Sequence, residues 1–214
     1  MIKKKSTTLI EYLILTDILI ATSFTTYKIV GMLAVIAYMM IESRLRKRPK
    51  EDSGFNLKVL PQAIKDTWPF ILLVVFITPL ITVLIGKMFV PEYFEHVINR
   101  VVPYVKMDSL GKLFTQLLIL AFGEEIVFRA FLQGRLSLFI YPRLAILLTS
   151  IVFALVHYTP GVMVVVVMDL LSVFVDSILF GIIFERSRNV FASTLAHFLG
   201  NSFGMILLIL FSRG

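Results

Sequence analysis

Long apolar stretches separated by short charged segments dominate the pattern of this 214-residue chain. A helix needs about 20 mainly apolar residues to cross the hydrocarbon core of a bilayer. Apolar stretches of roughly this kind predict spanning helices at Trp68 to Phe89, Leu110 to Gly134, Leu144 to Tyr158, Val162 to Phe184 and Val190 to Phe211. The pattern therefore predicts an all-α fold, a polytopic transmembrane helix bundle of about six to eight spans.

The segments before and between these spans are less regular. Residues 9–41 are mainly apolar and are broken by the polar run TSFTTYK at 22–28, and basic blocks at both ends favour a hairpin of two short helices over one long helix. Residues 42–67 are expected to form a polar connection, with KEDSG and Pro61 as turn signals. Residues 91–109 predict an external loop that could include an interfacial helix, and Pro79 predicts a kink.

Composition supports the membrane assignment. Hydrophobic residues make up 58% of the chain and charged residues 16%, whereas a soluble domain carries about a quarter charged residues. The chain contains no cysteine, which excludes thiol catalysis, thiolate metal sites and a disulfide framework. We therefore expect a multi-pass integral protein of the cell membrane, in contact with membrane lipids.

The net charge of +7 does not indicate nucleic-acid binding. The basic residues gather in short blocks beside apolar segments, KKK at 3–5, RLRKRPK at 44–50 and ERSR at 185–188. This distribution is typical of cytoplasmic loops under the positive-inside rule. We expect no nucleic-acid partner.

Three charged residues lie close together in the interior of the predicted span 110–134, where an ionisable group is costly and usually functional. Glu125 and Arg129 are four positions apart, which places them on one helix face as an ion pair. Glu124 is turned by about 100° from Glu125 around the helix. We expect Glu125 and Arg129 to support the site and Glu124 to face elsewhere, available for chemistry.

Two further segments, FALVH at 153–157 and HFLGN at 197–201, place histidines and an asparagine inside predicted spans. Taken singly, such residues more often serve helix packing than ligand binding. However, four polar side chains share a depth of about 10 to 20 Å when counted at about 1.5 Å per residue from the basic end of each span. They are Glu124, His157, His197 and Asn201. Their convergence predicts a hydrolytic or metal-binding site.

These segments also resemble the sequence motifs of a known protein family. EEIVFR fits EExxxR, FALVH fits FxxxH and HFLGN fits HxxxN, in that order. The chain resembles the CAAX-protease and bacteriocin-processing intramembrane endopeptidases, a group that includes the Ras-converting CAAX endopeptidase. The resemblance implies a catalytic transmembrane core at 110–211, preceded by N-terminal transmembrane helices and loops without a motif at 1–109. The implied catalytic residues are Glu124, His157, His197 and Asn201, and the implied supporting residues are Glu125, Arg129 and Phe153.

The implied activity is hydrolysis of peptide bonds in membrane-associated substrates, either prenylated CaaX-type proteins or leader peptides. Two mechanisms remain open. In one, Glu124 activates a water held with His157, while His197 and Asn201 donate hydrogen bonds to the oxyanion. In the other, Glu124, His157 and His197 bind zinc or another divalent metal. The absence of an HExxH motif favours the glutamate-dependent version.

A nonproteolytic membrane protein is the alternative, either an ion-coupled transporter or a bacteriocin-immunity or scaffold protein. A transporter would use Glu124, Asp169 and Asp176 as an ion relay. We expect instead that both aspartates line a cavity or bond to neighbouring helices. His96 is expected to be solvated in the external loop.

Overall fold

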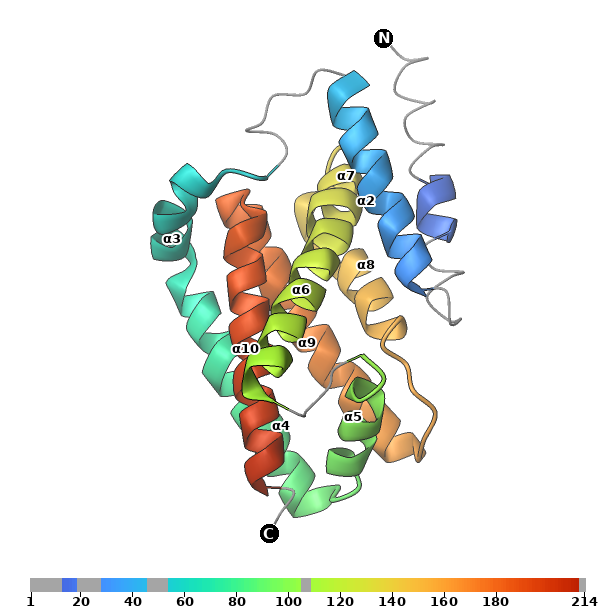
Figure 1. Ribbon diagram of the computed structural model, residues 1–214, viewed down its shortest axis with the longest axis vertical. Coiled ribbons are helices and arrows are strands. Elements are labelled where there is room, and N and C mark those ends of the chain that lie inside the picture. Colours follow the sequence, from blue (N-terminus) through green and yellow to red (C-terminus); the bar gives the residue numbers. More distant parts are fainter. Residues whose placement is uncertain (1–12, 19–27, 46–53, 105–108, 212–214) are drawn as a thin grey trace.

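The computed structural model describes residues 13–18, 28–45, 54–104 and 109–211, and all regular structure within these ranges is helical (Figure 1). The elements are α2 (Lys28–Leu45), η2 (Leu57–Val59), α3 (Leu60–Leu72), η3 (Leu73–Ile77), α4 (Thr78–Phe89), α5 (Tyr93–Val101), α6 (Leu110–Glu125), η4 (Ile126–Gln133), α7 (Gly134–Leu136), α8 (Pro142–Leu155), α9 (Met163–Ser187) and α10 (Val190–Phe211). The predicted all-α class is confirmed.

Among the described residues, three helical stretches are long and apolar enough to cross a membrane on their own, namely Leu57–Phe89, Met163–Ser187 and Val190–Phe211. Shorter apolar helices cover Val30–Glu42 and Pro142–Leu155. The chain is therefore a multi-pass integral membrane protein. The predicted N-terminal hairpin stays a prediction, because its turn falls almost entirely within 19–27, outside the described residues.

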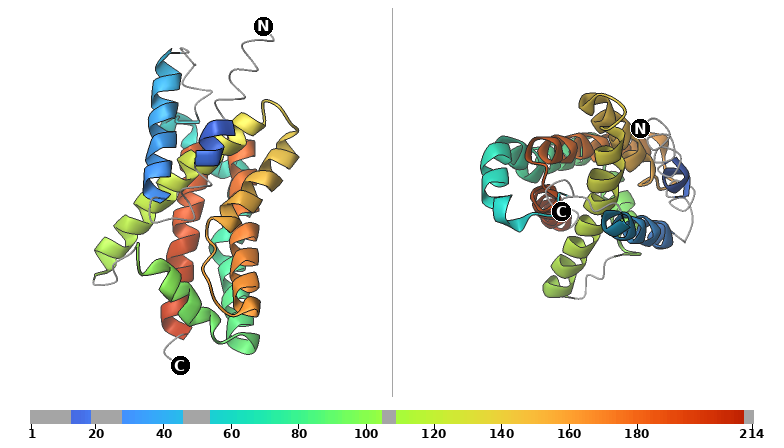
Figure 2. Two further views of the ribbon diagram at one scale, coloured as in Figure 1. Left: turned by 90° about the vertical axis from the view of Figure 1, so that its right-hand side faces the viewer. Right: turned by 90° about the horizontal axis from the view of Figure 1, so that it is seen from above.

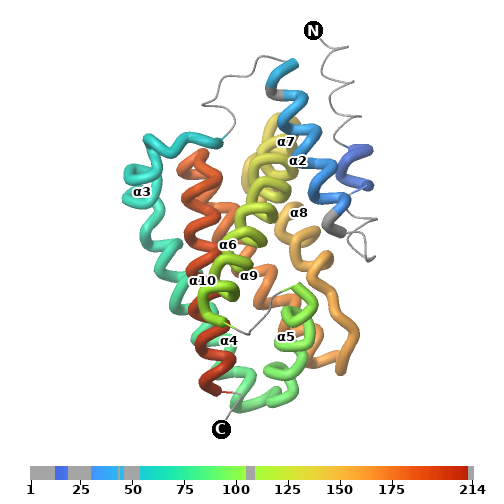
Figure 3. The backbone as a smooth tube through the Cα atoms, in the orientation of Figure 1, coloured from blue at the N-terminus to red at the C-terminus, as the bar shows by residue number. Residues whose placement is uncertain are grey.

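The expectation of a polar connection through residue 67 is wrong from Leu57 onward, where the chain is already helical. Pro61 lies in the first turn of α3, where proline is tolerated because the first backbone N–H groups of a helix have no partner within it. The π-helical segment η3 directly precedes Pro79, which lies in the first turn of α4. Figure 3 shows α3, η3 and α4 as one continuous bent path, so the irregularity expected at Pro79 is present.

Helices α9 and α10 form the centre of the bundle. Helix α9 packs against α8 and α3, and α10 packs against α6, η3, α4 and α9. Figure 2 shows α6 inclined to the axis of α10, so the two helices cross. Glycine permits the close contact of α10 with η3, since a Cβ at Gly200 would lie 3.0 Å from the carbonyl oxygen of Val74.

The predicted external loop at 91–109 contains α5, which lies across the end of the bundle where α4 ends and α9 begins (Figure 1). Its apolar side chains Tyr93, Phe94 and Val97 are buried against the bundle. Burial, together with the nearby Asp169 carboxylate, raises the pKa of Tyr93 to about 12, so this phenol stays neutral at physiological pH. Because its apolar side chains are buried, helix α5 packs onto the bundle as part of the fold.

Candidate active site

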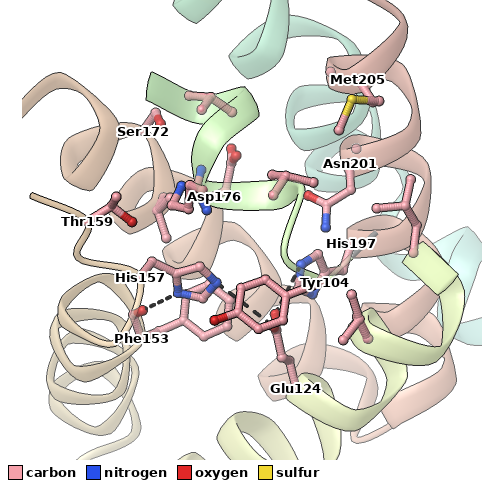
Figure 4. Close-up of a pocket in the computed structure, with 18 of the residues that line it drawn as sticks. Tyr104, Glu124, Phe153, His157, Thr159, Ser172, Asp176, His197, Asn201 and Met205 are labelled. Carbon is pink, nitrogen blue, oxygen red and sulfur yellow. Dashed lines mark hydrogen bonds and ion pairs between the residues drawn. The ribbon is translucent and has the colours of Figure 1, made fainter. Parts of the chain in front are cut away.

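A cavity of about 630 Å³ lies between the helices and is bordered by α4, α5, α6, α8, α9 and α10. The four residues predicted to be catalytic, Glu124, His157, His197 and Asn201, all line it (Figure 4). Glu124 lies in α6, His157 lies just after the end of α8, and His197 and Asn201 lie in α10. The structure thus brings the predicted set together.

The predicted ion pair between Glu125 and Arg129 is present. Glu125 Oε2 lies 3.4 Å from Arg129 Nε, and both side chains are fully buried. Arg129 Nη2 also donates a hydrogen bond of 2.8 Å to Ser177 Oγ on α9. The pair lies where α6 passes into the π-helical segment η4, which begins at Ile126. Such π-helical insertions are frequent at functional sites because they re-aim the side chains around them.

His197 lies between the two adjacent glutamates. Its Nδ1 is 3.0 Å from Glu125 Oε1, and its Nε2 is 3.6 Å from Glu124 Oε2. Because an ionised carboxylate only accepts hydrogen bonds, Nδ1 carries a proton and donates it to Glu125. The role of Glu125 is therefore wider than predicted, since it fixes both Arg129 and the imidazole of His197.

His157 approaches Glu124 from the other side. Its Nδ1 donates a hydrogen bond of 2.7 Å to the carbonyl oxygen of Phe153, and its Nε2 lies 3.8 Å from Glu124 Oε1. Each oxygen of Glu124 therefore faces the Nε2 of one histidine. The Glu124 side chain is 21% exposed, whereas its neighbour Glu125 is fully buried. Glu124 therefore faces the cavity, whereas Glu125 is enclosed by the fold.

Aromatic rings hold both imidazoles in place. The Phe153 ring centroid lies 4.5 Å from that of His157 and 5.9 Å from that of His197. Phe180 on α9 stacks on His197 at 4.4 Å. The supporting position of Phe153 matches the prediction. Sequence reasoning missed Phe180, because no spacing distinguishes it among 19 phenylalanines.

Asn201 lies one helical turn after His197 on α10 and is exposed to the cavity. Within the described part of the chain its side chain makes no hydrogen bond, so its amide is available to a ligand. An amide N–H directed into the cavity is a suitable donor to an oxyanion.

The two aspartates of α9 bond to neighbouring helices, as expected. Asp176 lines the cavity and accepts a hydrogen bond of 2.5 Å from Thr78 Oγ1 on α4. Asp169 does not line the cavity and pairs with Arg100 on α5 at 2.9 Å. The two aspartates thus lie in different surroundings, Asp176 at the cavity and Asp169 in an ion pair between α9 and α5.

The expectation that His96 is solvated is wrong. Its side chain is 8% exposed, and its Nε2 lies 3.5 Å from Asp169 Oδ2. The reason is the amphipathic character of α5, which folds onto α9 and buries the histidine between the helices.

The proposed metal ligands Glu124, His157 and His197 have donor types that suit zinc. Both histidines donate their Nδ1 proton elsewhere and present Nε2, which is the usual arrangement of a metal-bound imidazole. However, no group of three or more carboxylate, imidazole or thiol side chains within the described residues is arranged to hold a metal ion. A metalloprotease assignment thus has no support in this arrangement.

Comparison with known proteins identifies one family. Residues 106–203 match the family described as type II CAAX prenyl endopeptidase, Rce1-like. The matched segment includes all three motifs and every predicted site residue. No curated protein and no solved structure matches the chain.

Proposed function

We propose that this protein hydrolyses peptide bonds of membrane-associated substrates with a water activated by Glu124. The match of residues 106–203 to the Rce1-like family of type II CAAX prenyl endopeptidases supports this proposal. The substrates are prenylated CaaX-type proteins or leader peptides. The observation that carries the proposal is the position of Glu124, a cavity-facing carboxylate with a histidine Nε2 beside each of its oxygens.

The first step is attack of water on the scissile carbonyl. Glu124 takes one proton from a water held between its carboxylate and His157 Nε2, and the water oxygen forms a bond to the carbonyl carbon. His157 can accept a hydrogen bond at Nε2, because its proton is on Nδ1 and is donated to Phe153. The hydrogen bond to the backbone therefore orients the imidazole toward the water.

The carbonyl oxygen gains negative charge as this bond forms. The Asn201 amide donates a hydrogen bond to it, and His197, whose ring lies between the carboxylates of Glu124 and Glu125, donates a second one from Nε2. Fixed donors in a water-poor site stabilise developing charge strongly, by about 2.7 to 4 kcal/mol for one donor in a comparable oxyanion hole.

Collapse of the tetrahedral intermediate completes the reaction. The C–N bond breaks, and the protonated Glu124 gives its proton to the leaving amine. The new carboxyl group and the free amine together contain the atoms of one added water molecule. Glu124 returns to its ionised form, and no redox partner is needed.

The location of the cavity restricts the substrate. A folded hydrophilic chain cannot enter a space of about 630 Å³ between apolar helices. An extended peptide can, and a lipid or apolar segment would hold that peptide at the membrane. This reasoning supports membrane-bound or lipid-modified substrates over soluble folded proteins.

The test is a cleavage assay with protein purified in detergent. The protein is incubated with a prenylated CaaX peptide and with a general peptide library, each with and without chelator, and products are identified by mass spectrometry. We expect defined new fragments that a Glu124→Gln variant does not produce, while Glu92→Gln, at an exposed glutamate of the α4–α5 connection, produces them normally. Absence of any fragment with the folded wild-type protein would refute the peptidase assignment.

A further inference from the structure

Asp176 is a cavity-lining carboxylate that the proposed mechanism does not use. It lies on α9 and accepts a hydrogen bond of 2.5 Å from Thr78 Oγ1 on α4. Among the described residues no basic side chain forms an ion pair with it, whereas Asp169, seven residues earlier on the same helix, pairs with Arg100. A carboxylate without a counter-ion is costly inside a membrane protein, and such a group is by default functional. The position of Asp176 therefore indicates a ligand-binding role.

Contacts between Thr78 and α10 place Asp176 beside the catalytic part of α10. Thr78 Oγ1, which bonds to Asp176, also lies 3.3 Å from the carbonyl oxygen of Val74. A Cβ at Gly200 would lie 3.0 Å from the same oxygen, so the chain around Thr78 is in close contact with α10. Gly200 directly precedes Asn201. Asp176 thus lies alongside the segment of α10 that contains Asn201.

Helix α9 links Asp176 to His197 by a second, independent set of contacts. Phe180 follows Asp176 by four residues, so the two side chains share one face of the helix, and both line the cavity. The Phe180 ring stacks on His197 with centroids 4.4 Å apart. The carboxylate of Asp176 is close enough to this imidazole for the two to interact electrostatically.

Asp176 and Glu124 lie on opposite sides of the two histidines in the view of Figure 4, where the imidazoles of His157 and His197 lie between the two carboxylates. In the proposed mechanism water approaches the scissile carbonyl from the Glu124 side. The substituents of the carbonyl carbon therefore bend away from Glu124 as the new bond forms. Because His197 and Asn201 hold the oxygen, the N–H of the scissile bond is left to face Asp176.

The leaving nitrogen needs a hydrogen-bond acceptor as well as a proton donor. It already has one N–H when water attacks, and Glu124 supplies one further proton as the C–N bond breaks. The free amine then takes the proton of the new carboxylic acid, so the final products are a carboxylate and an ammonium group. A carboxylate beside the nitrogen accepts a hydrogen bond before cleavage and a stronger, charge-assisted one from the ammonium afterwards.

We propose that Asp176 binds the leaving amine, so that its carboxylate accepts a hydrogen bond from the N–H of the scissile amide and then pairs with the ammonium group of the released fragment. This inference rests on the proposed peptidase function and adds a substrate-contacting residue to the same site. Thr78 holds Oδ1 in place from α4, which leaves Oδ2 for the substrate. Asp176 itself neither gives nor takes a proton in the reaction.

The first test uses the fragment that wild type releases from the C-terminal side of the cleaved bond, identified by mass spectrometry. Calorimetry in detergent measures the dissociation constants of this fragment and of a desamino analogue, in which hydrogen replaces the amino group. We expect wild type to bind the amine about tenfold to a hundredfold more tightly than the analogue, the range of one charged hydrogen bond.

Three variants assign that preference to one carboxylate. Asp176→Asn keeps the shape of the side chain and its bond to Thr78 but removes the charge, so the two dissociation constants should become nearly equal. Asp169→Asn changes the other aspartate of α9, which does not line the cavity, and should keep the preference. Glu124→Gln should also keep it, which assigns the amine to Asp176 even if Asp176→Asn folds poorly.

A second test separates the amide N–H from the ammonium group. An ester in place of the scissile amide removes the N–H, and kcat/KM is measured for both substrates with wild type and Asp176→Asn. The variant should lower kcat/KM for the amide by about tenfold to a hundredfold and change that for the ester little.

The possible results distinguish the role of Asp176 from the peptidase function. Equal binding of the fragment and its desamino analogue by wild type would overturn the role of Asp176 while leaving the peptidase function intact. Equal losses for amide and ester in Asp176→Asn would also overturn it, because they would indicate a general structural effect. Loss of the amine preference in Asp169→Asn or Glu124→Gln would do the same. Failure of wild type to cleave any peptide of the general library would refute the peptidase function, and this inference with it.

Discussion

His197 and Glu125 are joined by a buried contact of 3.0 Å between Nδ1 and Oε1, which ties α10 to α6. Glu125 also pairs with Arg129, so one fully buried carboxylate fixes a guanidinium and an imidazole. The adjacent Glu124 turns its oxygens toward the cavity and the two histidine Nε2 atoms. The two neighbouring glutamates thus lie in different surroundings, Glu125 enclosed by the fold and Glu124 at the cavity.

Arg129→Ala should destabilise the protein as well as inactivate it. Removing the guanidinium leaves the buried Glu125 carboxylate without its cationic partner, at a cost of about 3 to 5 kcal/mol. Unfolding in detergent, followed by temperature or denaturant, measures the change. Lys65→Ala, at an exposed position of α3, serves as the control and should change stability by less than about 0.5 kcal/mol. An Arg129→Ala protein that melts with the parent would contradict the supporting role of this pair.

Asn201→Ala should lower kcat by about 10² to 10³ with little change in KM, because the lost hydrogen bond forms mainly in the transition state. Steady-state kinetics with the best peptide substrate separates the two parameters. Asn99→Ala removes an asparagine from the α5 part of the same cavity and should lower kcat by much less. If KM rises in Asn201→Ala while kcat holds, Asn201 binds the substrate in its ground state instead.

Chelator treatment should leave activity unchanged, and elemental analysis should find no stoichiometric metal. The reason is the proposed mechanism, in which Glu124 itself takes the proton from water. Purified wild type, His157→Ala and His197→Ala are compared for metal content. One tightly bound zinc per chain in wild type, absent from both variants, would replace the glutamate-only mechanism with a metal-dependent one.

The spans were predictable where the apolar pattern is uninterrupted. The range Val190 to Phe211 matches α10 at both ends, because the long apolar run starts and stops there. The start of the preceding long helix at Leu57 was missed for two reasons. Pro61 signals a turn as readily as a first helical turn, and α3 has exposed charged positions such as Lys65 that interrupt the apolar run.

Sequence spacing predicted the contacts of the site that lie within one helix. The pair of Glu125 and Arg129 follows from their separation of four residues on the same helix, and no tertiary information is needed. The bond from Glu125 to His197 and the stacking of Phe180 depend on how α6, α9 and α10 are rotated relative to one another. Sequence pattern does not give that rotation. The same limitation explains the error at His96, whose burial depends on where α5 docks.

The most direct test of the account is cleavage by Glu124→Gln compared with wild type, measured together with thermal stability. Glutamine keeps the shape and polarity of the side chain but cannot accept a proton from water, and the position is partly exposed, so the fold should be retained. We predict no detectable peptide cleavage and a melting temperature close to that of wild type. Cleavage within a few-fold of wild type would contradict the central role of Glu124.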